Sequence, residues 1–281
     1  MQKDAMNGSA IGIIGYGNMG SAIGELLKSK YQILAFDKDK SKTSNLQDIK
    51  TADSAIDLVN RVGTIILAVK PQDFEALLVQ IKESVGGKLA ISIAAGITTG
   101  YIEKLLGRAR VIRVMPNIGA KIGKAESVLS KGKNARDEDM GFVQELFNHI
   151  GKTWIMKEQM IDAATAISGS GPAYIYYDME VRKIDPLNVP KPIEQEYIQR
   201  LTKAAERVGF DSQTAVDFAS STTGSSLQLA ALSIASPVEL RKQITSKGGT
   251  TEAALKVLVK GGSWEEAAEA AKRRAGELSK G

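Results

Sequence analysis

Short apolar runs alternate with helical patterns along the first half of the chain. The run Ile11–Ile14 predicts a first strand, and the region Met19–Lys30 repeats apolar residues at helical spacing. Further strands are predicted at Gln32–Phe36, Thr64–Val69, Leu89–Ile93 and Arg110–Val114. Strands that alternate with helices are typical of a parallel sheet with helices on both faces. The first half therefore predicts a doubly wound α/β domain.

The second half has a different pattern. After Trp154 the chain is rich in alanine and leucine, and it repeats helical spacing with little sign of strands. Helices are expected over Leu227–Ile234, Ala253–Val259 and Trp264–Leu278. A boundary near residue 157 divides the chain into an α/β domain over 1–157 and an all-helical domain over 158–281.

Composition excludes several classes of function. The net charge of +5 is scattered and aromatic residues make up 5%, which argues against nucleic-acid binding. There is no cysteine and one histidine, His149, so thiolate chemistry and multi-histidine metal sites are excluded and no metal is expected. No apolar run approaches the ~20 residues of a membrane span. The leader Met1–Ala10 lacks an apolar signal core, so a cytoplasmic protein is expected.

A glycine motif joins the first predicted strand to the first helix. Gly15, Gly17 and Gly20 form a GxGxxG, in which the first permits a tight turn, the second admits a pyrophosphate and the third allows close helix packing. Asp37 ends the second strand about 20 residues later, where a carboxylate can hold ribose hydroxyls. The motif predicts a Rossmann-type dinucleotide-binding domain. The alternatives are a turn without a ligand and, for Asp37, a cap on a helix over Lys38–Asn45.

Three other segments carry candidate chemistry. Val69 and Lys70 end a buried strand, where ligands of such sheets bind, although Pro71 could simply terminate that strand. The loop Thr245–Thr251 precedes a helical pattern, so its N–H groups and hydroxyls can surround a small anion or merely cap the helix. The segment Ser168–Tyr174 reads by itself as a turn between helices.

Taken together, five motifs resemble pyrroline-5-carboxylate reductase. They are GIIGYGNMG at Gly12–Gly20, ILAVKPQD at Ile66–Asp73, RVMPN at Arg113–Asn117, ISGSGPAY at Ile167–Tyr174 and ITSKGGTTEAAL at Ile244–Leu255. The resemblance covers almost the whole chain apart from residues 178–197. It implies reduction of 1-pyrroline-5-carboxylate to L-proline by NAD(P)H, the last step of proline biosynthesis, in a homodimer whose helical domains pair and build the site at their interface.

The resemblance also assigns residues. Cofactor contacts fall on Gly15, Gly17, Asn18, Met19, Val69, Lys70, Pro71 and Asn117, with Asn117 near the nicotinamide. Together with Gly20 and Asp37 from the glycine motif, these form the expected cofactor site. Substrate contacts fall on Ser246, Gly248, Gly249, Thr250 and Thr251. Thr251 matches a threonine that hydrogen-bonds the substrate nitrogen and is the expected catalytic residue.

The residue inventory suits this chemistry. A protonated imine is already an electrophile, so hydride transfer depends on positioning more than on a strong acid or base. A single histidine therefore fits the reductase better than a lactate-type dehydrogenase, which uses a histidine as its proton carrier. A β-hydroxyacid dehydrogenase-like enzyme is a rival, but it requires a lysine where Ile161–Tyr177 contains none. A non-catalytic dinucleotide-binding regulatory protein is the other rival.

The chain departs from the family pattern at several positions. Lys247 replaces a more usual proline, Ile118-Gly119 replaces Thr-Pro, and Ser221 replaces threonine. Three prolines within Pro186–Pro192 predict a break in a helix that the family continues, either as a passive loop or as a reshaped dimer contact.

The coenzyme expectation rests on the end of the second strand. Asp37 should accept both ribose hydroxyls of NADH and repel a 2′-phosphate, whereas Lys38, Lys40 or Lys42 could attract that phosphate. Because Asp37 is the fixed group, NADH is expected to serve at least as well as NADPH.

Overall fold

The computed structural model describes residues 10–279, and the predicted leader Met1–Ala10 lies, except for Ala10, outside them. Contacts divide the chain into two compact units. The first takes in the described residues up to Met115 together with Ser127–Glu158. The second takes in Pro116–Glu126 and the described residues from Gln159 onward. The sequence predicts one boundary, near residue 157, whereas in the structure Pro116–Glu126 also pack with the helical unit.

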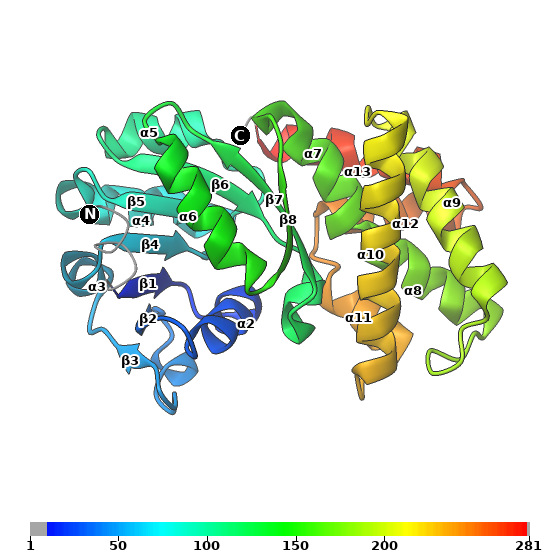
Figure 1. The fold of residues 1–281 in the computed structure, drawn as a ribbon, viewed down its shortest axis with the longest axis horizontal. Coiled ribbons are helices and arrows are strands. Elements are labelled where there is room, and N and C mark those ends of the chain that lie inside the picture. The colour runs from blue at the N-terminus through cyan, green and yellow to red at the C-terminus, as the bar shows by residue number, and fades with distance from the viewer. Residues whose placement is uncertain (1–9, 280–281) are drawn as a thin grey trace. The chain divides into compact units, whose positions relative to one another are not determined.

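The first unit is built on an eight-stranded sheet of order β3-β2-β1-β4-β5-β6-β7-β8 (Figure 1). Its strands are β1 (Ile11–Ile14), β2 (Ile33–Phe36), β3 (Lys50–Thr51), β4 (Thr64–Leu67), β5 (Leu89–Ser92), β6 (Arg110–Met115), β7 (Ala125–Lys131) and β8 (Gly151–Ile155). Neighbouring strands pair in parallel from β3 through β2, β1, β4 and β5 to β6, whereas β6 and β7 pair antiparallel. The predicted doubly wound sheet is confirmed.

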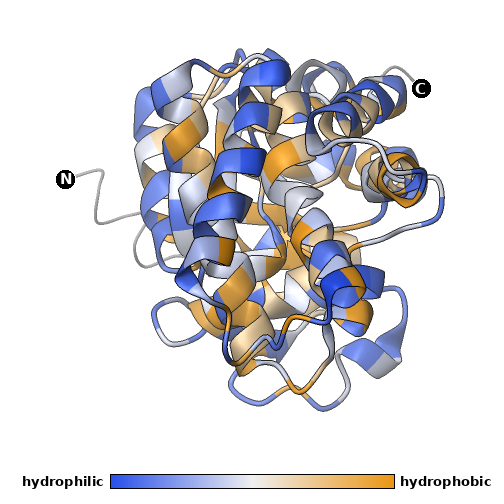
Figure 2. Ribbon diagram, turned by 90° about the vertical axis from the view of Figure 1, so that its right-hand side faces the viewer, coloured by the Kyte–Doolittle hydropathy of each residue, from blue (hydrophilic) through white to orange (hydrophobic). Residues whose placement is uncertain are grey.

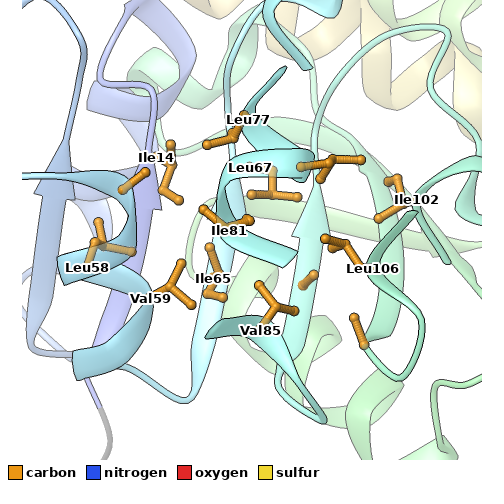
Figure 3. Close-up of a cluster of buried hydrophobic side chains, with 14 of the residues drawn as sticks. Ile14, Leu58, Val59, Ile65, Leu67, Leu77, Ile81, Val85, Ile102 and Leu106 are labelled. Atoms are coloured by element: carbon orange, nitrogen blue, oxygen red, sulfur yellow. The ribbon is translucent and has the colours of Figure 1, made fainter. Parts of the chain in front are cut away.

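Helices connect the strands of this unit. They are α2 (Asn18–Leu27), α3 (Ala55–Arg61), α4 (Pro71–Val85), α5 (Thr99–Leu106) and α6 (Asp137–Asn148), with a 3₁₀ turn η1 at Lys40–Lys42. One core cluster packs Ile65 and Leu67 of β4 against Leu58, Ile81 and other apolar residues of α3, α4 and α5 (Figure 3). Ile66, between the two β4 residues, is also fully buried. Because successive side chains of a strand point to opposite faces, both faces of β4 are covered.

The second unit is helical. Its helices are α7 (Ile161–Ala164), α8 (Gly171–Arg182), α9 (Lys191–Arg207), α10 (Ser212–Leu232), α11 (Pro237–Gln243), α12 (Thr250–Val259) and α13 (Trp264–Leu278). A π-helical turn, η4 (Thr165–Gly169), joins α7 to α8, and η2 (Ile118–Ile122) is a 3₁₀ turn. Figure 2 shows hydrophobic and hydrophilic residues interleaved along the helices. No helix within residues 10–279 is long and apolar enough to cross a membrane.

Trp264 organises the centre of the helical unit. Its ring meets Tyr174 of α8 edge-on at 5.9 Å and stacks on Tyr197 of α9 at 5.7 Å between centroids. The guanidinium of Arg200 lies over the same ring at 4.2 Å. Aromatic pairs and a cation above a ring each add to the apolar burial of these large side chains. The arrangement holds α8, α9 and α13 together.

The proline segment breaks the helix as predicted. Helix α8 ends at Arg182, where Lys183 takes a left-handed φ of 55°, and α9 begins at Lys191 with a proline in its first turn. Proline is accepted there because the first helical N–H groups have no partner within the helix. The helix predicted over Leu227–Ile234 is the last part of α10 and ends two residues earlier, at Leu232, because Ser233 takes an extended conformation with a ψ of 141°.

Candidate functional site

The glycine loop between β1 and α2 has the geometry that a close-approaching ligand needs. Gly15 has a φ of +96°, and a Cβ on it would lie 2.6 Å from the Ala68 carbonyl oxygen. A Cβ on Gly20 would lie 2.0 Å from the carbonyl oxygen of Gly15. Gly17 has nothing within 4 Å of its would-be Cβ, and it caps α2 without any side-chain hydrogen bond. The first N–H groups of α2 are thus left without a side-chain cap, in the arrangement that binds phosphates.

Asp37 ties the glycine loop to the end of β2. Its carboxylate is 6% exposed and accepts the backbone N–H of Tyr16 at 2.7 Å and that of Asp39 at 2.9 Å. The ammonium group of Lys42 lies 3.3 Å from both carboxylate oxygens. A carboxylate has about four acceptor positions, so these contacts occupy them all. Asp37 does not cap a helix over Lys38–Asn45, because the 3₁₀ turn η1 is capped by Asp39.

The other two candidate lysines, Lys38 and Lys40, have different surroundings. Lys38 pairs with Asp73 of α4 at 2.7 Å, and its side chain is largely exposed. Lys40 is exposed and belongs to η1. Lys42 is therefore the cation that neutralises the buried carboxylate, which the sequence alone left undecided among three lysines.

The end of β4 presents the next group of expected cofactor residues. Val69 packs partly buried against the core cluster, whereas Lys70 and Pro71 are exposed at the start of α4. Asn18 is exposed and Met19 half-buried in the first turn of α2. The backbone N–H of Ala68 donates to Ile14, which keeps the end of β4 beside the end of β1. The expected cofactor residues of the first unit thus share one edge of the sheet.

Asn117 belongs to the second unit, where its side chain hydrogen-bonds three backbone groups. Its side-chain oxygen accepts the N–H groups of Gly119 and Glu126, both at 3.0 Å, and its amide donates to the Ser168 carbonyl at 3.0 Å. A Cβ on Gly119 would lie 2.2 Å from the Lys124 carbonyl oxygen. The glycine that replaces the more usual proline is therefore required by this tight turn.

The loop predicted to bind substrate leads directly into α12. Gly248 takes a φ of +70°, and a Cβ on Gly249 would lie 2.3 Å from the Ser246 hydroxyl oxygen. Gly249 is the N-cap of α12 and makes no side-chain capping bond. The loop is exposed at Ser246, Lys247 and Gly248. Uncapped N–H groups and the positive end of the helix dipole make this a place for a carboxylate.

Two charged side chains also contact this loop. The N–H of Gly248 donates to Glu252 at 2.7 Å, and Arg274 of α13 donates to the Gly248 carbonyl at 2.7 Å. Glu252 pairs with Lys256, and this bond and the Gly248 N–H lower the pKa of its carboxyl. Neither Glu252 nor Arg274 is expected at this loop from the sequence. Arg274 had no signal, because it lies far along the chain from the loop.

Thr251 is buried, and its hydroxyl is held by a residue that is not among those expected from the sequence. Its Oγ1 lies 3.1 Å from the Oγ of Ser170, which is also 3.1 Å from the Oγ1 of Thr250. Ser170 is 0% exposed and Thr251 is 4% exposed. The signal for Ser170 was available, because it lies inside the ISGSGPAY motif. Within residues 10–279, no cluster of histidine and acidic side chains is arranged to hold a metal ion.

Family models match two parts of the chain. Residues 195–278 match the model for pyrroline-5-carboxylate reductase dimerisation, and residues 10–96 match the model described as NADP oxidoreductase coenzyme F420-dependent. The chain is 33% identical to pyrroline-5-carboxylate reductase of Pisum sativum, over 96% of each chain.

Solved structures agree with these matches. A pyrroline-5-carboxylate reductase from Coxiella burnetii is 30% identical, covers 98% of this chain and 100% of its own, and superposes with a TM-score of 0.66. The Plasmodium falciparum pyrroline carboxylate reductase, crystallised with NADP bound, is 26% identical over 98% of this chain and 99% of its own, with a TM-score of 0.64. By sequence and by fold, the chain belongs to the pyrroline-5-carboxylate reductase family.

Proposed function

We propose that this protein reduces 1-pyrroline-5-carboxylate to L-proline with NAD(P)H, the final step of proline biosynthesis. The observation that carries the proposal is the substrate loop. In this chain, a glycine turn opens α12 without a side-chain cap, and it is followed at once by the buried Thr251. That combination offers N–H groups for a carboxylate and a hydroxyl for a ring nitrogen.

The residues at the start of α2 fit a dinucleotide. The open space at Gly17 and the uncapped N–H groups of the helix suit a pyrophosphate, while Gly15 and Gly20 keep the backbone close. Asn18, Met19, Val69, Lys70 and Pro71 complete the proposed cofactor contacts of the first unit, and Asn117 is the proposed contact of the second. A bound NAD(P)H supplies a hydride for reduction of the imine carbon.

The second unit is proposed to hold the substrate. Ser246, Gly248, Gly249 and Thr250 surround its carboxylate, and Thr251 hydrogen-bonds its nitrogen. Such positioning is the main requirement, since a protonated imine accepts hydride without a strong acid. His149 belongs to the first unit, where its ring centroid lies 6.0 Å from that of Tyr31.

The coenzyme preference follows from Asp37 and its neighbours. Two backbone N–H groups fix the carboxylate at the end of β2, where it can accept ribose hydroxyls and repel a 2′-phosphate. Lys42 partly offsets that repulsion and must turn aside to free acceptor positions. We propose that NADH serves at least as well as NADPH.

The assay of wild-type protein with 1-pyrroline-5-carboxylate and reduced cofactor tests the function. The Thr251→Ala variant should lower kcat at least tenfold and leave cofactor affinity within about twofold, because Thr251 lies in the substrate loop. The matched control is Thr214→Ala, since Thr214 also lies in the first turn of a helix of the same unit. Equal turnover by wild type and Thr251→Ala would remove Thr251 from the mechanism. Cofactor binding without any turnover by wild type would favour a regulatory protein.

A further inference from the structure

Three hydroxyl groups from two distant segments meet at the start of α12. Ser170 Oγ lies 3.1 Å from Thr250 Oγ1 and 3.1 Å from Thr251 Oγ1. Ser170 is 0% exposed, Thr251 is nearly buried and Thr250 is half-buried. We call these three residues the hydroxyl triad. They form a chain of hydrogen bonds from the partly accessible Thr250 through Ser170 to Thr251.

The position of Ser170 is fixed by its backbone. It follows the π-helical turn η4, and its N–H donates to the Thr165 carbonyl at 2.8 Å. Asn117 holds the same turn through its bond to the Ser168 carbonyl. Single π-helical turns cost regular helical bonding and occur frequently at functional sites. The turn directs the Ser170 hydroxyl at α12 rather than along its own helix.

The protons of the triad can be arranged in two ways. Each hydroxyl has one proton to donate and lone pairs to accept, so Ser170 donates to one threonine and accepts from the other. If Thr250 donates to Ser170 and Ser170 to Thr251, the proton of Thr251 is free to donate to a ligand. If the direction is reversed, Thr251 has lone pairs free to accept. The oxygens keep their places in both arrangements.

We propose that Ser170 is a positioning residue that sets the direction of the Thr251 hydroxyl and, when the imine is neutral, relays a proton to it. This inference rests on the proposed function. A protonated imine nitrogen carries an N–H, which Thr251 accepts in one arrangement of the triad. A neutral imine nitrogen has a lone pair, to which Thr251 donates in the other.

The proton balance for the neutral imine is closed by water. With the reduced cofactor bound, the imine carbon would gain a hydride as a new C–H bond, and the electrons of the C=N π bond would form an N–H bond with the proton of Thr251. Thr251 takes the proton of Ser170, Ser170 takes that of Thr250, and Thr250 takes one from solvent. Every hydroxyl ends neutral. With the protonated imine, the substrate already carries the proton and the triad serves only to orient it.

Kinetics of Ser170→Ala test this role. The variant should lower kcat for 1-pyrroline-5-carboxylate at least tenfold, because hydride transfer depends on the alignment that the Thr251 hydroxyl gives the substrate, while the cofactor dissociation constant stays within about twofold. The matched control is Ser226→Ala, another buried serine of this unit, whose hydroxyl donates to the Thr222 carbonyl at 2.6 Å. Ser170→Cys retains a weak donor and should recover part of the lost kcat.

A double-mutant cycle separates positioning from a general structural role. In a Thr251→Ala background, Ser170→Ala should cause no further loss, because the group on which it acts is gone. An equal loss in both backgrounds, or a kcat of Ser170→Ala within twofold of wild type, overturns the inference while the proposed function stands. If Ser170→Ala does not fold, an unchanged kcat of Ser170→Cys overturns it in the same way. Absence of turnover by wild type overturns the proposed function and the inference together.

Discussion

Asp37 shows how much the role of one carboxylate depends on its neighbours. The sequence identifies it as the acid at the end of the second strand, but the structure gives its oxygens to two backbone N–H groups and to Lys42. The backbone bonds hold the glycine loop in place, and the lysine cancels charge that a 2′-phosphate would otherwise meet. We therefore propose that coenzyme choice at this site depends on Asp37 and Lys42 together rather than on the aspartate alone.

Substitutions in this pair should change coenzyme preference in opposite directions. Asp37→Ser removes the negative charge and should raise kcat/KM for NADPH relative to NADH by about tenfold, or ~1.4 kcal/mol. Lys42→Ala leaves the carboxylate uncompensated and should shift the ratio toward NADH. Steady-state kinetics with NADPH and with NADH measure the ratio of the two kcat/KM values, and Lys40→Ala is the control. A wild-type preference for NADPH above tenfold would contradict the proposal.

Glu252 is the residue that should most oppose the substrate carboxylate. It is negatively charged and accepts the Gly248 N–H, one of the donors proposed for the substrate. Glu252→Gln removes that charge and should lower the KM for 1-pyrroline-5-carboxylate by about twofold to fivefold, with little change in kcat. Glu265→Gln, in the first turn of α13, is the control. A higher KM would mean that Glu252 stabilises the loop rather than competing with the substrate carboxylate for the Gly248 N–H.

At the scale of elements, the break between α8 and α9 is stabilised by a polar cluster. Asp178 accepts from Arg182 at 3.1 Å, from Arg200 at 3.0 Å and from the Tyr197 hydroxyl at 3.0 Å. Glu196 bonds both arginines, at 2.8 Å from Arg182 and 3.4 Å from Arg200. Burial, followed by the charge of Asp178, raises the pKa of Tyr197 above its usual range, so this phenol remains a donor. The cluster joins the two helices that the prolines separate.

Loss of Asp178 should therefore loosen this helix pair. Asp178→Ala leaves the Tyr197 hydroxyl and two arginines without their shared acceptor, and should lower the free energy of unfolding by about 1–2 kcal/mol, since the ion pairs are partly exposed. The exposed Asp217, which accepts a hydrogen bond from Gln213 on its own helix, provides the control Asp217→Ala. Denaturant unfolding measures both variants. Equal stabilities would show that packing around Trp264 alone holds α8 and α9.

Some elements could be predicted from the sequence and others could not. Strands β1, β2, β4 and β5 are expected from the sequence because each is a mainly apolar, largely buried run, and β6 is expected although Arg110 and Arg113 interrupt its apolar residues. Strands β7 and β8 were not identified, because β7 buries Glu126, Ser127 and Ser130, and β8 has no fully buried residue. A polar strand is recognisable only when the partners that satisfy its side chains are known.

At the scale of the whole molecule, the helical unit has the features of a surface that pairs with another subunit. The matched dimerisation model covers residues 195–278. Within the described part of the helical unit, large apolar side chains are exposed at Val181, Leu187, Val216, Leu232, Ile234 and Val259. A second copy of this chain is the partner that we propose for the helical unit, because water-exposed apolar groups gain free energy when they are covered.

Light scattering at micromolar concentration should accordingly give a mass of at least two subunits. Replacing both Leu232 and Ile234 with Glu should shift the population toward monomer and reduce activity with it. Val79→Glu, at an exposed apolar residue of α4 in the first unit, should leave the mass unchanged. An active wild-type monomer would refute the shared-site expectation.

The sequence by itself determined the fold class, the glycine turns and the break at the prolines. These depend on local sterics and on the spacing of neighbouring residues, which a linear pattern records. Only the tertiary structure decided which lysine meets Asp37, that Pro116–Glu126 pack with the helical unit, and that Ser170 meets Thr251, 81 residues away. Such contacts result from the packing of whole elements, and no local preference specifies which distant side chains that packing brings together.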